Sequence, residues 1–324
     1  MKITVLDASA ANPGDLSWEA FERFGEVTCY DVTSNDQLIE RAKDSEILLT
    51  NKTVFTKESF DSLPKLKYIG VLATGYNVVD LEAAKAHGVC VTNVPEYATY
   101  ATAQMAVSLL LELTNRVGMH TASVFNGDWV RSPQFCYTLA PLTELAGKTC
   151  AVVGLGKIGR RVCTILNALG MNVIGVPHKE QDSVEIDGKV YPCMSIDRAF
   201  PLADVITFHC PLTSDTENLL SGDMFDKLKD NVLIINTARG PIVNSKDLAK
   251  ALKEGKIRGY GADVITREPM LPDDPLLSLK DEINVVITPH IAWAPKETRK
   301  RLIDEAAKNL ESFLDGVIVN CVNP

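Results

Sequence analysis

A glycine-rich turn, Cys150-Ala-Val-Val-Gly154-Leu-Gly156-Lys-Ile-Gly159, decides the fold predicted for this chain. An apolar strand pattern precedes the turn, and a helical spacing of apolar residues follows it. In a G-x-G-x-x-G turn the first glycine permits a tight bend, the second lets the backbone approach a pyrophosphate, and the third lets the helix pack closely on the strand. The sequence therefore predicts a dinucleotide-binding turn. A structural turn that merely uses glycine is the alternative.

The start of the helix after this turn is the expected phosphate site. Its first N–H groups have no partner within the helix, and the helix dipole is positive there. We expect Gly154, Gly156 and Gly159 to bind the cofactor. Lys157 and Ile158, inside the turn, are expected to line the same site.

The strand predicted next, 172–176, indicates which dinucleotide is bound. In NAD-binding units this strand ends in an acid that binds the ribose hydroxyls. Here Pro177 stands at that position, followed by His178 and Lys179. Without a carboxylate a 2′-phosphate is not repelled, and the two basic side chains attract one. The cofactor is thus NAD or NADP, with a lean to NADP and with His178 and Lys179 as contacts. A solvated loop at these residues is the alternative.

Short apolar runs alternate with helical patterns along the whole chain, and 81–87 and 245–254 are two of these helical segments. This alternation predicts an α/β protein with parallel sheets covered by helices. The segment 100–117 is helical and apolar on more than one face, which favours a helix between two domains or at a subunit interface. The segment 125–145 has no clear period and is interpreted as a long ordered connection. The predicted strands are 3–6, 47–49, 68–71, 150–153, 172–176, 205–209, 232–236, 259–264 and 285–288.

Composition restricts the class of protein. The formal net charge of −9 disfavours nucleic acid and anionic membranes as partners, although a local basic site can still bind an anionic substrate. The eight cysteines form no C-x-x-C pair, which is typical of free thiols in a reducing compartment. The first residues read as a strand rather than a signal peptide, and no apolar run is long enough to span a bilayer. We therefore expect a cytoplasmic protein.

Charged side chains follow three of the predicted strands. Arg239 follows 232–236, Asp263 and Glu268 lie at and beyond the end of 259–264, and His290 follows 285–288. Because ligands bind at the carboxyl ends of strands in open α/β sheets, these three turns are expected to meet near the glycine turn. Each residue alone also has a structural explanation, as an ion pair, a turn residue or a strand cap.

Together these residues suit the reduction of a 2-oxo acid. Histidine titrates near neutral pH and can give or take the proton at the carbonyl oxygen. A nearby carboxylate favours the imidazolium and orients its ring. Arginine binds the substrate carboxylate and polarises the carbonyl. This chemistry requires no metal, and the five histidines include no pair with the spacing of a metal site on one helix face.

These motifs resemble the D-isomer-specific 2-hydroxyacid dehydrogenase family over nearly the whole chain. Within that family the chain looks most like glycerate dehydrogenases, also called hydroxypyruvate reductases. The residues that carry the resemblance are the glycine turn, Asn236-Thr-Ala-Arg239-Gly240, Asp263-Val-x-x-x-Glu268-Pro269, Thr288-Pro-His-Ile-Ala-Trp293, Ala73-Thr74-Gly75-x-Asn77-x-x-Asp80 and Gly127-Asp-Trp129-x-Arg-Ser132-Pro-x-Phe135.

The resemblance implies a role for individual residues. His290 is the acid/base, Glu268 is its partner, and Arg239 binds the substrate together with the backbone N–H groups of Thr74 and Gly75. Further residues are expected around the cofactor. Asp263 faces the nicotinamide carboxamide and Thr102 borders that ring; His209, Cys210 and Pro211 border the adenosine, and Thr237 and Ala238 precede Arg239 in the same site.

The family fold implies two Rossmann-like domains. A discontinuous, flavodoxin-like substrate domain takes 1–99 and 295–324, and a cofactor-binding Rossmann domain takes 100–294 and carries the contacts of a homodimer. The substrate is expected to be a small 2-oxo or 2-hydroxy acid, with hydroxypyruvate or glyoxylate first because Tyr76, Phe135 and Trp293 would crowd the pocket. Phosphoglycerate or D-lactate dehydrogenase is one alternative. A dinucleotide-sensing protein like the corepressors that share this fold is another.

Overall fold

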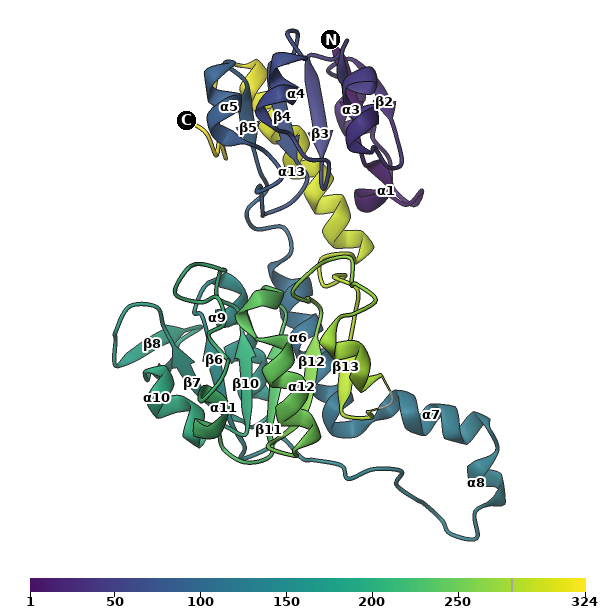
Figure 1. The fold of residues 1–324 in the computed structure, drawn as a ribbon, viewed down its shortest axis with the longest axis vertical. Helices are drawn as coiled ribbons and strands as arrows, with labels where there is room; N and C mark the ends of the chain where they lie inside the picture. The colour runs from purple at the N-terminus through teal and green to yellow at the C-terminus, as the bar shows by residue number, and fades with distance from the viewer. Residues whose placement is uncertain (281) are drawn as a thin grey trace. The chain divides into compact units, whose positions relative to one another are not determined.

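The computed structural model of this protein describes residues 1–280 and 282–324. The chain divides into two compact units (Figure 1). Unit 1 consists of Met1–Ala98 and Trp293–Pro324, and unit 2 of Thr99–Ala292. These bounds differ by one or two residues from the domains expected from the sequence.

Unit 1 is built on a five-stranded parallel sheet with the order β2-β1-β3-β4-β5. This is the flavodoxin-like order, with a topological switch point between β1 and β3. Residues near the C-terminus pair antiparallel to the edge strand at Thr92 and Cys321. The strands are β1 (Lys2–Val5), β2 (Glu26–Cys29), β3 (Ile47–Thr50), β4 (Tyr68–Val71) and β5 (Cys90–Thr92).

Helices cover both faces of the unit 1 sheet, because its central strands are apolar on both sides. One face packs against α13, whose buried side chains include Leu302 and Leu310, and the other packs against α3, α4 and α5. The helices are α1 (Ala8–Ala11), α2 (Glu19–Glu22), α3 (Asn35–Ala42), α4 (Lys57–Asp61), α5 (Leu81–Ala86) and α13 (Lys296–Leu314).

Unit 2 contains a six-stranded parallel sheet with the order β13-β12-β11-β10-β6-β7. The chain leaves β6 for β7 on one side and later returns to β10 on the other, so the switch point lies between β6 and β10. An antiparallel hairpin, β8–β9, follows β7. The strands are β6 (Thr149–Val153), β7 (Asn172–Val176), β8 (Ser183–Ile186), β9 (Lys189–Pro192), β10 (Val205–Phe208), β11 (Val232–Asn236), β12 (Ile257–Ala262) and β13 (Val285–Ile287).

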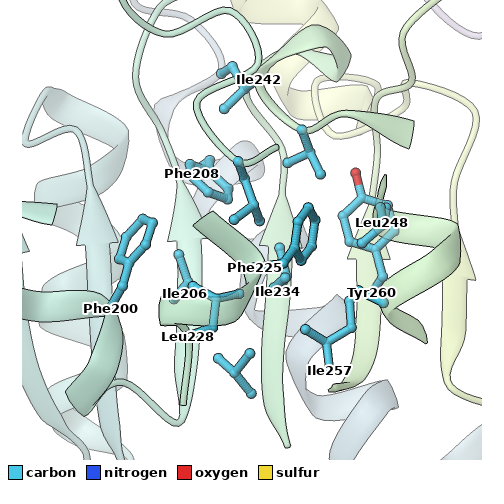
Figure 2. Packing of buried hydrophobic residues seen from close by; sticks show 14 of the residues in the cluster. Phe200, Ile206, Phe208, Phe225, Leu228, Ile234, Ile242, Leu248, Ile257 and Tyr260 are labelled. Carbon is cyan, nitrogen blue, oxygen red and sulfur yellow. The ribbon is translucent and has the colours of Figure 1, made fainter. Parts of the chain in front are cut away.

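Two apolar cores lie on the two faces of the unit 2 sheet. Figure 2 shows one of them, where Phe208 and Ile234 of the sheet pack with Phe225 and Leu248 of the covering helices. The other core lies between the sheet and helices α6 and α9. The helices are α6 (Thr99–Asn115), α7 (Val117–Phe125), α8 (Asp128–Arg131), α9 (Lys157–Ala168), α10 (Ile196–Ala199), α11 (Met224–Lys227) and α12 (Ser245–Lys253), with 3-10 turns η1 (Phe200–Leu202), η2 (Gly240–Ile242) and η3 (Pro275–Leu279).

The α/β class with parallel sheets is confirmed, and each of the nine predicted strands corresponds to a strand of the structure within two residues at either end. The strands β2, β5, β8 and β9 were not predicted. They are short, and β2 and β9 are largely exposed, so an apolar run does not mark them.

The helix predicted at 100–117 is α6, which ends at Asn115 because Arg116 adopts a left-handed backbone conformation (φ 53°). Its apolar side chains pack on the sheet and on α9 inside unit 2. Their burial therefore needs no subunit interface. The interpretation of 125–145 as a connection is only partly right, since α8 lies within it. Figure 1 shows α7 and α8 standing away from the sheet of unit 2.

No helix in the described part of the chain combines the length and the hydropathy needed to cross a membrane.

Candidate active site

The glycine turn joins β6 to α9 at the carboxyl edge of the unit 2 sheet. A side-chain carbon added at Gly154 would lie 2.6 Å from the backbone nitrogen of Cys210, in the turn after β10. One added at Gly159 would lie 1.9 Å from the carbonyl oxygen of Gly154. One added at Gly156 would have no protein atom within 4 Å. Glycine at 154 and 159 thus serves the packing of the protein, whereas the open space at Gly156 fits a bound group.

The turns beside the glycine turn carry buried polar atoms that lack a partner among the described residues. They are Oγ1 of Thr237, after β11, and Nδ1 of His209, after β10. Buried polar atoms in native proteins are nearly always hydrogen-bonded. These two atoms lie at the carboxyl edge of the sheet, near the switch point between β6 and β10. Together with the first N–H groups of α9 they fit a dinucleotide, whose phosphates and ribose hydroxyls offer both donors and acceptors.

His209 is held neutral at this edge. Burial lowers the pKa of its imidazole to about 3, because the charged form would lose its hydration. Part of the residue is accessible, but Nδ1 is buried, and Nε2 lies 2.9 Å from the hydroxyl of Thr207. A neutral ring beside Gly154 can donate or accept one hydrogen bond without adding a charge.

The turn after β11 carries Arg239. Asn236 stabilises this turn, because its side-chain oxygen accepts from the N–H of Ala238 and its amide donates to the carbonyl of Arg239 (3.0 and 2.9 Å). Arg239 is exposed, and its guanidinium donates to the carbonyl of Ala238. Gly240 touches the next turn, since an added side-chain carbon would lie 1.9 Å from the backbone of Ile265. The turns after β11 and β12 are therefore in contact.

His290 and Glu268 form a hydrogen-bonded pair. Nδ1 of His290 lies 2.6 Å from Oε2 of Glu268, and each side chain is about one third exposed (31% and 33%). The other oxygen of Glu268 accepts from the N–H of Ile265 at 3.1 Å. The turn that carries Glu268 thus holds its carboxylate in place. Since an ionised carboxylate only accepts, Nδ1 carries a hydrogen, and Nε2 is the ring atom that can exchange a proton.

Asp263 lies under the loop that carries His290, and only 1% of the residue is exposed. Its carboxylate accepts from the hydroxyl of Thr288 (2.5 Å) and from the N–H groups of Ile291 and Ala292 (2.9 and 2.7 Å). These bonds join the end of β12 to the residues after β13. The expected contact between Asp263 and the nicotinamide stays a prediction.

Thr74 and Gly75 lie in unit 1, in the loop after β4. Two side chains hold the carbonyls of this loop: Asn93 donates to Thr74 at 2.7 Å, and Asn51 donates to Leu72 at 2.5 Å. Within the described part of the chain, the amides of Thr74 and Gly75 donate no hydrogen bond. They are therefore available to an acceptor from outside the protein.

The remaining residues expected to bind the cofactor lie on several helices and turns of unit 2. Lys157 and Ile158 form the first turn of α9, and Thr102 is buried on α6. The exposed His178 and Lys179 follow β7 after the half-buried Pro177. Cys210 and Pro211 follow β10, and Ala238 is buried beside Arg239. That these residues bind the cofactor stays a prediction.

Sequence reasoning overlooked the residues that hold the site residues in place. Asn236, Thr288 and Asn93 make the hydrogen bonds that shape the loops of Arg239, His290 and Thr74. Asn236 had a local signal, because an asparagine that ends a strand before a turn often bonds the backbone two residues on. Thr288 and Asn93 had none, because their partners are distant in the sequence.

Comparison with known proteins identifies the family of this chain. The family model described as "D-isomer specific 2-hydroxyacid dehydrogenase, NAD binding domain" matches residues 107–292, more than half of the chain. The chain is 44% identical over 326 residues to a hydroxypyruvate reductase of Blautia hydrogenotrophica, covering all of both chains. The chain belongs to this family. It is also 37% identical to a glycerate dehydrogenase of Methylorubrum extorquens, over 89% of this chain and 88% of the relative.

Solved structures share the fold over the whole chain. The TT0316 protein of Thermus thermophilus superposes with a TM-score of 0.86 at 32% identity, over 99% of this chain and 100% of that one. An acyclic imino acid reductase in complex with NADPH and D-Arg superposes with a TM-score of 0.83 at 28% identity, over 99% and 100%.

Family membership confirms the class of enzyme expected from the motifs. This D-2-hydroxyacid dehydrogenase is an oxidoreductase that acts with a nicotinamide dinucleotide. The relatives described above are reductases and dehydrogenases, so the alternative of a sensing protein without catalysis has no support among them.

Proposed function

We propose that this dehydrogenase reduces hydroxypyruvate or glyoxylate, reversibly, to D-glycerate or glycolate. The pair formed by His290 and Glu268 at the carboxyl edge of the unit 2 sheet is the observation that carries the proposal. The identity of 44% to a hydroxypyruvate reductase along the whole chain supports this choice of substrate over D-lactate or phosphoglycerate.

The bound cofactor supplies the hydride that adds to the carbonyl carbon. His290 gives the carbonyl oxygen a proton from Nε2, and in the reverse direction it takes that proton from the hydroxyl. Glu268 holds the ring through Nδ1 and stabilises the imidazolium that donates. Arg239 offers two parallel N–H groups to the substrate carboxylate and polarises the carbonyl. In unit 1, the amides of Thr74 and Gly75 are proposed as further donors to the carboxylate.

We propose that the enzyme uses NADPH at least as well as NADH. Three residues support this choice: Pro177 leaves no carboxylate directly after β7, and the exposed His178 and Lys179 are basic. A 2′-phosphate would meet two donors, and the first acid after β7, Glu180, lies beyond both of them. The proposed cofactor contacts also include the glycine turn, His209 and Thr237 described above.

We also propose a homodimer formed through α7 and α8. Three apolar side chains in these helices and just after α8 are almost fully exposed: Phe125 (86%), Val130 (89%) and Phe135 (91%). The segment that presents them is held by polar bonds, since Asp128 accepts from Ser123 and from Arg131 (both 2.6 Å). Several almost fully exposed apolar side chains within one short segment are typical of a subunit interface.

A kinetic panel tests the proposed reaction. Purified enzyme is assayed with NADH and with NADPH against hydroxypyruvate, glyoxylate, pyruvate and phosphohydroxypyruvate. We expect the highest kcat/KM for hydroxypyruvate or glyoxylate, and kcat/KM with NADPH no lower than with NADH. Higher values for pyruvate or phosphohydroxypyruvate would replace the proposed substrate.

The variant His290→Ala tests the proposed acid/base. It should lower kcat by about 10²- to 10⁴-fold, the usual contribution of a general acid or base. The dissociation constant of NAD(P)H should stay within about twofold, because the glycine turn lies on other strands. Full activity in His290→Ala would remove His290 from the mechanism.

A further inference from the structure

His290 has an unusual backbone conformation. Its φ is 55°, in the left-handed region that residues other than glycine rarely adopt. Such a conformation is strained and persists only where the surrounding structure imposes it. The described structure must therefore contain contacts that fix the backbone on both sides of residue 290.

The carboxylate of Asp263 makes such contacts. One donor, the hydroxyl of Thr288, lies two residues before His290, and the other two, the amides of Ile291 and Ala292, lie directly after it. One side chain thus binds the loop on both sides of the imidazole. The bonds also satisfy a carboxylate that is almost fully buried and would otherwise be costly to desolvate.

Asp263 and Glu268 lie in one turn and act on one loop. Glu268 binds the imidazole ring at Nδ1, whereas Asp263 binds only the backbone and a hydroxyl around it. The ring can reach Glu268 only if the backbone of residue 290 points it there. We propose that Asp263 is the positioning residue of this reaction, which sets the conformation of the 288–292 loop and so places Nε2 of His290.

The proposal rests on the proposed role of His290, and it goes beyond a contact between Asp263 and the nicotinamide. Three hydrogen bonds occupy three of the about four acceptor sites of the carboxylate, so a positioning role and a nicotinamide contact have to be separated by what each does to kcat and to cofactor affinity. Loss of positioning should lower kcat and leave cofactor affinity unchanged, because a small displacement of a catalytic group costs up to about 10²-fold in rate. Loss of a nicotinamide contact should weaken cofactor binding.

The test compares Asp263→Asn with Thr288→Val and Thr288→Ser. Asparagine keeps the shape, but its NH2 group then faces the N–H of either Ala292 or Ile291, and the backbone bond at that position is lost. Valine at 288 removes one donor, and serine retains it. We expect kcat to fall about 10- to 100-fold in Asp263→Asn and by a smaller factor in Thr288→Val, with recovery in Thr288→Ser. The dissociation constant of NAD(P)H should stay within about twofold in all three.

Asp204→Asn is the matched control for lost stability. Asp204 also accepts from a backbone N–H, that of Thr149 (2.9 Å). Both residues lie at the amino ends of strands in the same sheet, away from the carboxyl edge that carries His290. This variant should lower the melting temperature while leaving kcat unchanged. If Asp263→Asn behaves like Asp204→Asn, Asp263 is only structural and the proposal fails.

Two further results distinguish the proposals. If His290→Ala is inactive but both Asp263→Asn and Thr288→Val keep full kcat, the positioning role is wrong and the proposed acid/base stands. If His290→Ala retains activity, the acid/base assignment fails first. Should Asp263→Asn not fold, Thr288→Val and Thr288→Ser decide the question alone: equal kcat in these two variants and the wild type overturns the proposal.

Discussion

At the scale of single residues, the buried histidine beside the glycine turn gives the protein a pH-dependent stability. Burial lowers the pKa of His209 to about 3, below its usual value of 6.5. Between these values the unfolded chain binds the proton and the folded chain does not. This contribution to stability is therefore complete above pH 6.5 and is lost as the pH falls toward 3.

The variant His209→Gln tests this dependence. We expect the free energy of unfolding of the wild type, relative to the variant, to fall by up to about 2 kcal/mol between pH 7 and pH 5. Urea unfolding of the cofactor-free protein at the two pH values measures it. A constant difference between wild type and variant would show that His209 is protonated in the folded state.

The sequence predicted where the proposed catalytic side chains lie but not how they are held. Arg239, Glu268 and His290 follow strands of one parallel sheet, and the carboxyl ends of such strands share an edge. This rule predicted that their turns converge, and the family resemblance implied the pairing of Glu268 with His290, which the structure shows at 2.6 Å. The bonds of Asp263 to the 288–292 loop could not be predicted, because they depend on coordinates of residues 25 or more positions away along the chain.

At the scale of elements, the predictions succeeded where an element lies in a core. Strands β6, β10 and β11 are buried along most of their length and appear as apolar runs. The edge strand β2 is largely exposed and has no such run. The helix α8 has no buried residue, so no helical period of apolar residues reveals it.

In the glycine turn before α9, substitutions at two different glycines test the packing of the turn and the binding of the cofactor separately. Gly156→Ala places its new carbon in open space, so we expect an unchanged melting temperature without cofactor. The same carbon would obstruct a pyrophosphate, so the dissociation constant of NAD(P)H should rise at least about tenfold. Calorimetric titration and thermal unfolding measure the two effects.

Gly159→Ala is the contrasting variant. Its new carbon would lie 1.9 Å from the carbonyl oxygen of Gly154, so the turn has to shift. Overpacking of this kind costs about 1–3 kcal/mol, and the melting temperature without cofactor should fall. If Gly156→Ala binds the cofactor normally, the open space at Gly156 is not the pyrophosphate site.

At the scale of the whole molecule, each of the two units has its own parallel sheet with a switch point, and chain order alone does not reveal this division. Unit 1 takes its strands from the first 92 residues and the long helix α13 from the other end of the chain. The alternation of strands and helices predicted parallel sheets. The discontinuous division was expected only from the family resemblance, because α13 has the same amphipathic pattern whichever sheet it covers.

The state of assembly is the remaining property at this scale, and we have proposed a dimer that forms through α7, α8 and the residues that follow them. The double variant Val130→Asp, Phe135→Asp puts two charges on the apolar surface proposed as the subunit interface. Burying them unpaired would cost several kcal/mol, so the dimer should dissociate. Light scattering on a size-exclusion column should then give the mass of one chain, 35.4 kDa, in place of twice that value.

Val32→Asp provides the control for this measurement. Val32 is also an exposed apolar residue (70%), but it lies in unit 1, whereas the proposed interface belongs to unit 2. It should leave the mass unchanged. A monomeric wild type, or a double variant that keeps the dimer mass, would show that Phe125, Val130 and Phe135 are exposed for another reason. Because a dimer held by this surface buries side chains that the single chain leaves in water, dissociation should also lower the melting temperature at low protein concentration.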